Sequence, residues 1–132
     1  MTTFIDTSAF LAVLDADDLH HEKAKEVWKE LVASDAKLIS TNYVSVETCA
    51  VAQNRLGVKA VRTFQEDISP IVTIDCIDEV AHRAGMTGLL TAARKRLSLV
   101  DCVSFDCMRR LGAKKAFVFD RHFKEQGFEC LP

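Results

Sequence analysis

The chain has 132 residues, of which 48% are hydrophobic and 27% charged, and its net charge is −2. This length and composition suit one compact domain over residues 1–132 and exclude a largely disordered chain. No apolar run approaches the roughly 20 residues of a membrane span, and Met1–Asp6 lacks the basic start of a signal peptide, so we expect a cytoplasmic protein.

Apolar periodicity divides the chain into short strands and amphipathic helices. In chain order, the predicted strands are Thr3–Asp6, Lys37–Ser40, Ile71–Ile74, Ala116–Phe119 and Phe128–Leu131. The predicted helices are Ser8–Leu14, Leu19–Ala33, Asn42–Leu56, Lys59–Ile68, Ile77–Arg96 and Asp101–Leu111. Strands separated by helices in this way indicate an α/β domain with a mostly parallel sheet. The functional sites of such sheets lie at the carboxyl ends of the strands.

Two aspartates directly follow predicted strands. Asp6 comes after Thr3-Phe4-Ile5, and Asp120 comes after Phe117-Val118-Phe119. If the strands are parallel, both acids emerge at the same edge of the sheet. Each acid also suits a structural role, because Asp6 is placed to cap the helix near Ser8 and Asp120 to cap the following turn.

Glu47 lies inside a predicted helix rather than at a helix end. It stands three residues after Val44 and four before Val51, a spacing that predicts a place on the inward apolar stripe. A carboxylate on a buried face needs a counter-charge, because burial of an unpaired charge is costly. An arginine or a metal cation would serve.

Asp101 opens a predicted helix after the apolar segment Leu97–Val100. It shares a stripe with Phe105 and Met108, so we expect it on the buried side. Either Ser98 or Asp101 is suited to be the N-cap of this helix.

Carboxylates that converge without a counter-charge repel one another, and a divalent cation relieves that repulsion. Oxygen ligands without a nearby His or Cys pattern favour Mg²⁺ or Mn²⁺ over zinc. Acidic sites of this kind support phosphoryl transfer. The hydroxyls of Thr7 and Ser8, beside Asp6, are placed to hold a phosphate oxygen or a metal-bound water, and helix capping is an equally good interpretation for Thr7.

The charges are distributed unevenly along the chain. Residues 1–93 carry 8 Lys and Arg against 14 Asp and Glu, whereas residues 94–124 carry 9 against 3. A basic segment that holds a few acids suits a surface that faces phosphates. A solvated helix end, where cations are favoured in any case, explains Arg109 and Arg110 equally well.

The five cysteines show no metal or disulfide pattern. Their number is odd and no pair has CxxC spacing, so we interpret them as small apolar residues in a reducing compartment. They are Cys49, Cys76, Cys102, Cys107 and Cys130.

The chain resembles the PIN-domain nucleases, and especially the VapC-type toxin ribonucleases. The matching segments are Phe4–Ser8, Ser45–Glu47, Leu97–Asp101 and Val118–Phe123, and the end at Gly127–Pro132 is also similar to the close of such domains. These segments occur in the order of the family and extend over nearly the whole chain.

This resemblance implies a three-layer α/β/α fold with a mostly parallel sheet of about five strands. It also implies that Asp6, Glu47, Asp101 and Asp120 hold Mg²⁺ or Mn²⁺ and cleave RNA. Many such proteins are toxins that a cognate antitoxin protein silences, and many form homodimers. Cys102 departs from the small residue that is common beside the third acid, which predicts a slightly crowded site.

The resulting hypothesis is a metal-dependent endoribonuclease. Asp6, Asp101 and Asp120 would bind one or two cations directly or through water, while Glu47 completes the shell or orients the attacking water. Ser8 would support the phosphate. Asp106 and His122 are left outside the predicted site. The residues predicted to guide the RNA strand are Arg94, Lys95 and Arg96.

Two alternatives are weaker. A phosphatase with an aspartyl nucleophile usually carries a second Asp two residues after the first, and here Ser8 follows Asp6 at that distance. A non-catalytic PIN-like module that binds RNA or protein is disfavoured because all four acids are present. A measurement of turnover separates this module from an enzyme.

Overall fold

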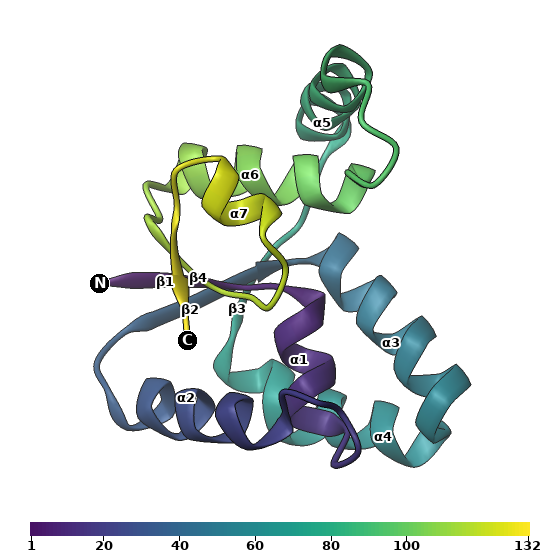
Figure 1. Ribbon diagram of the computed structural model, residues 1–132, viewed down its shortest axis with the longest axis vertical. Coiled ribbons are helices and arrows are strands. Elements are labelled where there is room, and N and C mark those ends of the chain that lie inside the picture. Colours follow the sequence, from purple (N-terminus) through teal and green to yellow (C-terminus); the bar gives the residue numbers. More distant parts are fainter.

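Five parallel strands form the centre of the protein in the computed structural model, which describes residues 1–132 (Figure 1). The strands are β1 Thr2–Ile5, β2 Lys37–Thr41, β3 Thr73–Asp75, β4 Lys115–Phe117 and β5 Glu129–Leu131. Their spatial order is β3-β2-β1-β4-β5, and every neighbouring pair is parallel. The predicted parallel α/β sheet is therefore confirmed.

Helices cover both faces of this sheet. They are α1 Thr7–Leu14, α2 His21–Ala33, α3 Asn42–Leu56, α4 Val58–Thr63, α5 Glu79–Ala92, α6 Leu99–Leu111 and α7 His122–Glu125. In Figure 1, α1, α2 and α4 lie below the strands, whereas α6 and α7 lie above them and α5 packs on α6. This is the three-layer arrangement that the resemblance implied. None of these helices has both the length and the apolar composition needed to cross a bilayer.

The central strands are apolar because both of their faces are covered. Phe4 and Ile5 of β1 and Phe117 of β4 have no exposed surface, and they pack with helix residues such as Phe105 and Phe123. Burial of each large side chain contributes about 1.5–3 kcal/mol. This core supplies a rigid base for the polar residues at the strand ends.

The strands β1 and β4 bring two of the predicted acids to one edge. Ile5 pairs with Phe117, and the Asp6 N–H donates to the Phe117 carbonyl at 3.1 Å. Asp6 joins β1 to α1, and Asp120 lies just after the end of β4. The predicted placement of both acids at the same edge is confirmed.

Helices α6 and α2 each begin two residues away from the predicted start. Helix α6 begins at Leu99, not at Asp101, because Ser98 is its N-cap and accepts the Asp101 N–H at 3.0 Å. Helix α2 begins at His21, and Leu19, which was predicted to be its first residue, lies in the preceding turn with 92% of its surface exposed.

Two further predicted helices are shorter than expected. The helix predicted at Ile77–Arg96 is limited to α5 because Asp78 caps its start and Ala93, with a φ of 51°, ends it. The helix predicted at Lys59–Ile68 is α-helical only to Thr63, and a π-helical turn (η1, 64–68) and a 3-10 turn (η2, 69–71) then lead to β3. The predicted strands are confirmed with shifts of one or two residues at their ends.

Candidate functional site

A groove of about 510 Å³ lies at the carboxyl edge of β1 and β4. Its walls come from the start of α1, from α3, from the connection between α5 and α6, and from the segment after β4. The residues that line it are Asp6, Thr7, Ser8, Leu11, Glu47, Val51, Arg55, Arg96, Ser98, Asp101, Asp120 and His122. The fold thus brings together all four predicted acids.

Asp6 is the most deeply buried of these acids, with 3% of its surface exposed. Its Oδ2 accepts hydrogen bonds from Ser8 Oγ at 2.7 Å and from Ser8 N at 3.1 Å, so it also caps α1. The pKa of Asp6 is raised to about 7, and burial is the largest cause of this shift. The carboxylates of Asp120 and Asp101 contribute to the shift, and the two Ser8 hydrogen bonds oppose it. A nearby cation would stabilise the charged form of such a carboxyl group.

Ser8 positions Asp6 and ties α1 to the end of β4. Its hydroxyl donates its proton to Asp6 and accepts the Phe119 N–H at 3.0 Å. A hydroxyl has one proton to donate, so Ser8 has none left for a phosphate oxygen in this structure. In this structure Ser8 positions Asp6, and its predicted support of a phosphate oxygen or a metal-bound water stays a prediction.

Thr7 has the free hydroxyl that Ser8 lacks. Thr7 is buried and lines the groove, and its Oγ1 has no hydrogen-bond partner. Asp6, not Thr7, caps α1, so the capping interpretation of Thr7 is wrong. A buried hydroxyl without a partner is uncommon, and this one has almost no accessible surface, so a phosphate oxygen or a water would reach it only after a local shift.

Asp101 lies on the buried side of α6, as predicted. It is 9% exposed, and Phe105 and Met108 on the same stripe are buried. The Ser98 N–H donates to Asp101 Oδ2 at 3.1 Å, which completes a capping box with the Ser98 hydroxyl. Capping therefore fixes the position of Asp101 without using both of its oxygens.

Asp120 is half-buried and lines the groove from the segment after β4. Its Oδ1 accepts the His122 N–H at 2.9 Å. Burial raises the pKa of Asp120, the nearby Asp101 carboxylate raises it further, and the hydrogen bond from His122 opposes the shift. The pKa shifts of Asp6 and Asp120 share their largest cause and include repulsion within the same group of acids.

Glu47 lies beside the buried stripe of α3, not on it. The buried residues of this helix are Val44, Thr48 and Ala52, which repeat every four residues. Glu47 and Val51 lie next to that stripe and face the groove. The prediction that Glu47 points inward is corrected to a half-buried position at the groove wall.

The four acids supply oxygen ligands of the kind that Mg²⁺ and Mn²⁺ prefer. No group of three or more Asp, Glu, His or Cys side chains in the structure is arranged as a closed ligand cluster. Mg²⁺ usually keeps several waters and binds one or two carboxylates directly, so a groove with a deeply buried Asp6 and the unpartnered Thr7 hydroxyl fits it. Which carboxylates would bind directly stays a prediction.

Only one of the three basic residues predicted to guide RNA lies at the groove. Arg96 lines it, whereas Arg94 pairs with Glu125 at 3.2 Å and Lys95 is exposed outside the groove. The turns between Ala93 and Ser98 direct these neighbouring side chains to different surfaces, which the basic run by itself does not specify.

Sequence reasoning missed Arg55 and left out His122, and both line the groove. Arg55 follows Glu47 and Val51 at four-residue steps, so the α3 helical pattern contained a signal for it. His122 was assigned to a turn, and its half-buried side chain instead contributes to the groove wall. Asp106 lies outside the groove, as predicted, and pairs with Arg110.

The cysteines are free, as predicted, and none lines the groove. Cys102 is buried where α6 faces α5, and a Cβ on Gly88 would lie 3.8 Å from the Cys102 Cβ. The expected crowding of the acidic site by Cys102 is therefore wrong, because this side chain packs between two helices.

Comparisons with known proteins agree with this architecture. The model of the PIN domain family matches residues 3–129. The 23S rRNA-specific endonuclease VapC20 from two strains of Mycobacterium tuberculosis is 29% identical over 126 residues, which cover 95% of this chain and 94% of the relative.

Solved structures show the same fold. The crystal structure of M. tuberculosis VapC20, described as a toxin that cleaves the sarcin-ricin loop, has a TM-score of 0.88 and 27% identity, and the match covers 98% of this chain and 99% of that one. VapBC2 from Rickettsia felis (TM-score 0.72, 10% identity) and FitAcB from Neisseria gonorrhoeae (0.69, 14%) share the fold alone, with at least 96% of each chain covered. The resemblance read from the sequence is confirmed, and the chain belongs to the PIN-domain family.

Proposed function

We propose that the acidic groove is the active site through which this protein hydrolyses RNA phosphodiester bonds with the aid of Mg²⁺ or Mn²⁺. The observation that carries the proposal is the gathering of four carboxylates from four separate segments around the buried Asp6. Membership of the PIN family and the kinship with a ribosomal RNA endonuclease confirm the predicted enzyme class, an endoribonuclease.

We assign the residues of the groove different roles in this reaction. Asp6 and Asp120, at the strand ends, would hold the cation, and Asp101 would join them directly or through water. A bound divalent cation would polarise the phosphate and lower the pKa of a bound water. Glu47, on α3, would orient the attacking water, and the Thr7 hydroxyl would donate to a phosphate oxygen after a local shift.

The proposed substrate is a loop of ribosomal RNA. The support is the name of the relative, a 23S rRNA-specific endonuclease that matches this chain along almost its whole length. The VapC20 crystal structure is described as that of a toxin that cleaves the sarcin-ricin loop.

We further propose a cognate antitoxin protein and a homodimer as partners. Toxin–antitoxin proteins are among the structural neighbours, which supports an antitoxin. The support for a second copy is the exposed apolar surface on α3 and α5, which includes Val46, Val80 and Leu90. Light scattering at several concentrations tests for the dimer, and a monomer throughout would contradict it.

A cleavage assay tests the central proposal. Purified protein is incubated with intact 23S rRNA, a sarcin-ricin loop oligonucleotide and an unrelated RNA pool, in Mn²⁺, Mg²⁺ or EDTA. We expect cleavage with either metal, none in EDTA, and loss of cleavage in Asp101→Asn. The matched control is Asp106→Asn, because Asp106 lies on the same helix and outside the groove.

The outcomes also separate the enzyme from a silent binding module. Equal cleavage by the Asp101→Asn and Asp106→Asn variants would contradict the assignment of the site. Absence of turnover with all RNAs, together with calorimetric binding of Mn²⁺, would favour a metal-binding module without catalysis.

A further inference from the structure

Six of the eight arginines are engaged by other side chains of the same protein. Five of them form ion pairs, and Arg109 donates to the Gln126 amide at 2.8 Å and lies over the ring of Phe128. The ion-paired arginines are Arg62, Arg83, Arg94, Arg110 and Arg121. The remaining two, Arg55 and Arg96, have no side-chain partner, and both line the acidic groove.

The two free guanidinium groups come from different walls of the groove. Arg55 lies near the end of α3, eight residues after Glu47, which is about 12 Å along the axis at 1.5 Å per residue. Arg96 lies in the connection between α5 and α6, two residues before the cap Ser98. In Figure 1 α3 runs downward from the end of β2, whereas the connection between α5 and α6 lies above it. The acidic groove is therefore lined by two guanidinium groups that come from separate segments.

This arrangement suits a polyanion better than a single small anion. Four carboxylates in the groove repel phosphate, whereas exposed arginines at its borders attract it. The guanidinium fork matches two oxygens of one phosphate. Since Arg55 and Arg96 belong to different segments, they suit two different phosphates of one strand that lies in the groove.

We propose that Arg55 and Arg96 bind two RNA phosphates near the scissile bond, so that a single strand lies in the groove in contact with both α3 and the α5–α6 connection. The inference rests on the proposed function of the groove as the active site. Contacts of this kind position the strand and carry no sequence information. The two arginines therefore contribute affinity for RNA, and other residues determine which RNA is bound.

Salt dependence of RNA binding tests the inference. The variants Arg55→Gln, Arg96→Gln and their double are made in an Asp101→Asn background. The matched control is Arg62→Gln, which removes the same charge from the neighbouring helix α4, outside the groove. Anisotropy of a fluorescein-labelled, mixed-sequence single-stranded RNA is measured in EDTA over a range of NaCl concentrations, and thermal melting verifies that each variant is folded.

We expect each groove variant to weaken binding about tenfold at low salt, as loss of a charged hydrogen bond predicts. The slope of log affinity against log salt should fall by about 0.7 for each arginine removed, and by about 1.4 in the double variant. The Arg62→Gln control should keep the slope of the background. Groove variants that are indistinguishable from this control would overturn the inference.

A poly-glutamate peptide serves as a second probe. If the groove variants lose binding to this peptide and keep the affinity and slope for RNA, the arginines recognise an acidic protein and the inference is wrong. Parallel cleavage assays keep the two proposals apart. Metal-dependent cleavage that Asp101→Asn abolishes, with unchanged RNA binding in the arginine variants, overturns only the phosphate contacts, whereas cleavage that Asp101→Asn retains overturns the active site.

Discussion

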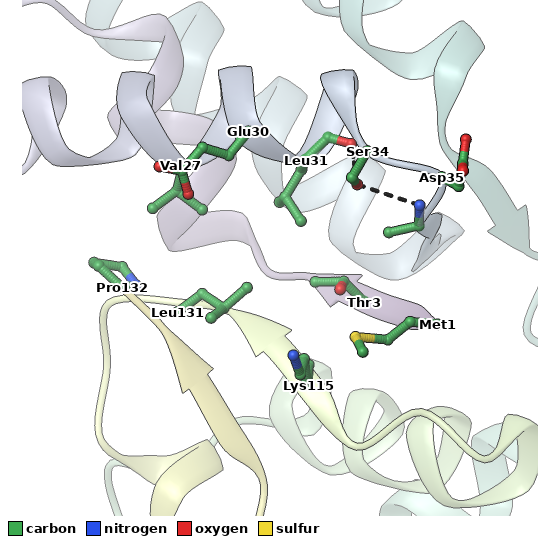
Figure 2. Close-up of a pocket in the computed structure, with 11 residues that line it drawn as sticks. Met1, Thr3, Val27, Glu30, Leu31, Ser34, Asp35, Lys115, Leu131 and Pro132 are labelled. Atoms are coloured by element: carbon green, nitrogen blue, oxygen red, sulfur yellow. Dashed lines mark hydrogen bonds between the residues drawn. The ribbon is translucent and has the colours of Figure 1, made fainter.

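Two hollows of similar volume adjoin the same sheet, and their side chains differ. One is the acidic groove of about 510 Å³ at the carboxyl edge. The other, of about 580 Å³, lies between α2 and the strands β1, β4 and β5. Figure 2 shows Val27 and Leu31 of α2 facing Thr3 and Leu131 across it.

The larger hollow contains acids as well, but they lie in a different environment. Glu30 and Asp35 are exposed to solvent, whereas Asp6 in the groove is 97% buried by its neighbours, since only 3% of its surface is exposed. Volume and apolar lining are common guides to a binding site. Here the carboxyl groups of Asp6 and Asp120, whose pKa values are raised by burial, identify the site better. Burial of a carboxylate costs free energy, and groups with such shifted pKa values are concentrated at functional sites.

The largest expected effect comes from removing one carboxylate charge from the acidic groove, with the same change in the apolar hollow as the control. Asp6→Asn should lower kcat for RNA cleavage on the order of 10²–10³-fold, because a charge that acts in the transition state is lost. Asp35→Asn removes the same charge from the apolar hollow and should leave kcat unchanged. Single-turnover cleavage measures both. Equal activity of the two variants would contradict the proposal that the acidic groove, and not the apolar hollow, is the active site.

The buried charge of Asp6 also predicts how stability depends on pH without metal. The pKa of Asp6 is raised to about 7 in the folded protein from an ordinary value of 3.8, so the folded state binds the extra proton between these values. Stability contributed by this proton is present below about pH 4 and is lost as the pH rises through 7. The loss is on the order of 4 kcal/mol in EDTA.

Urea unfolding from pH 4.5 to 8 measures this effect. Because other groups also titrate, the informative quantity is the difference between the wild type and Asp6→Asn, which should grow with pH in favour of the variant. Mn²⁺ at pH 8 should stabilise the wild type and not the variant. A difference that does not vary with pH would contradict a raised pKa.

The apolar hollow should matter for stability and not for cleavage. Leu31→Ala removes a buried side chain from its wall and should cost about 2–3 kcal/mol of unfolding free energy, with kcat unchanged. Leu19→Ala is the control, because Leu19 is exposed and its loss should lie within about 0.5 kcal/mol. A fall in cleavage by folded Leu31→Ala would link the two hollows.

The smallest expected effect concerns the packing between helices α5 and α6. A Cβ on Gly85 of α5 would lie 2.5 Å from Val103 Cγ2 on α6, whereas a Cβ on Gly88 makes only ordinary contacts. Gly85→Ala should therefore cost about 1–2 kcal/mol, since overpacking exceeds the gain in helix propensity. Gly88→Ala should be neutral or stabilise by up to about 1 kcal/mol. Thermal melting that ranks the two variants in the opposite order would contradict the close α5–α6 contact.

Local patterns in the sequence predicted most of the fold. Alternating strands and helices indicated the parallel sheet, and Asn42–Leu56 was predicted with the bounds of α3. Most errors lie at the helix ends, although the short helix α7 was not predicted and residues 64–68 form a π-helical turn. Ser98 and Asp78 act through side-chain caps, and Ala93 takes a left-handed φ, all of which require the backbone geometry of the turn. Periodicity has little information at such positions, because caps and turns do not repeat.

Residue types and their order along the chain were enough to predict the four acids, the oxygen-rich chemistry of the site and the family. The packing of distant segments was needed to show that Ser8 hydrogen-bonds to Asp6 and that Glu47 lies at the groove wall. It also shows that Arg55 and Arg96 line the groove while Arg94 pairs with Glu125. These outcomes depend on contacts between distant segments. A side chain finds its partner through the packing of the elements that carry it, and no local pattern specifies that packing.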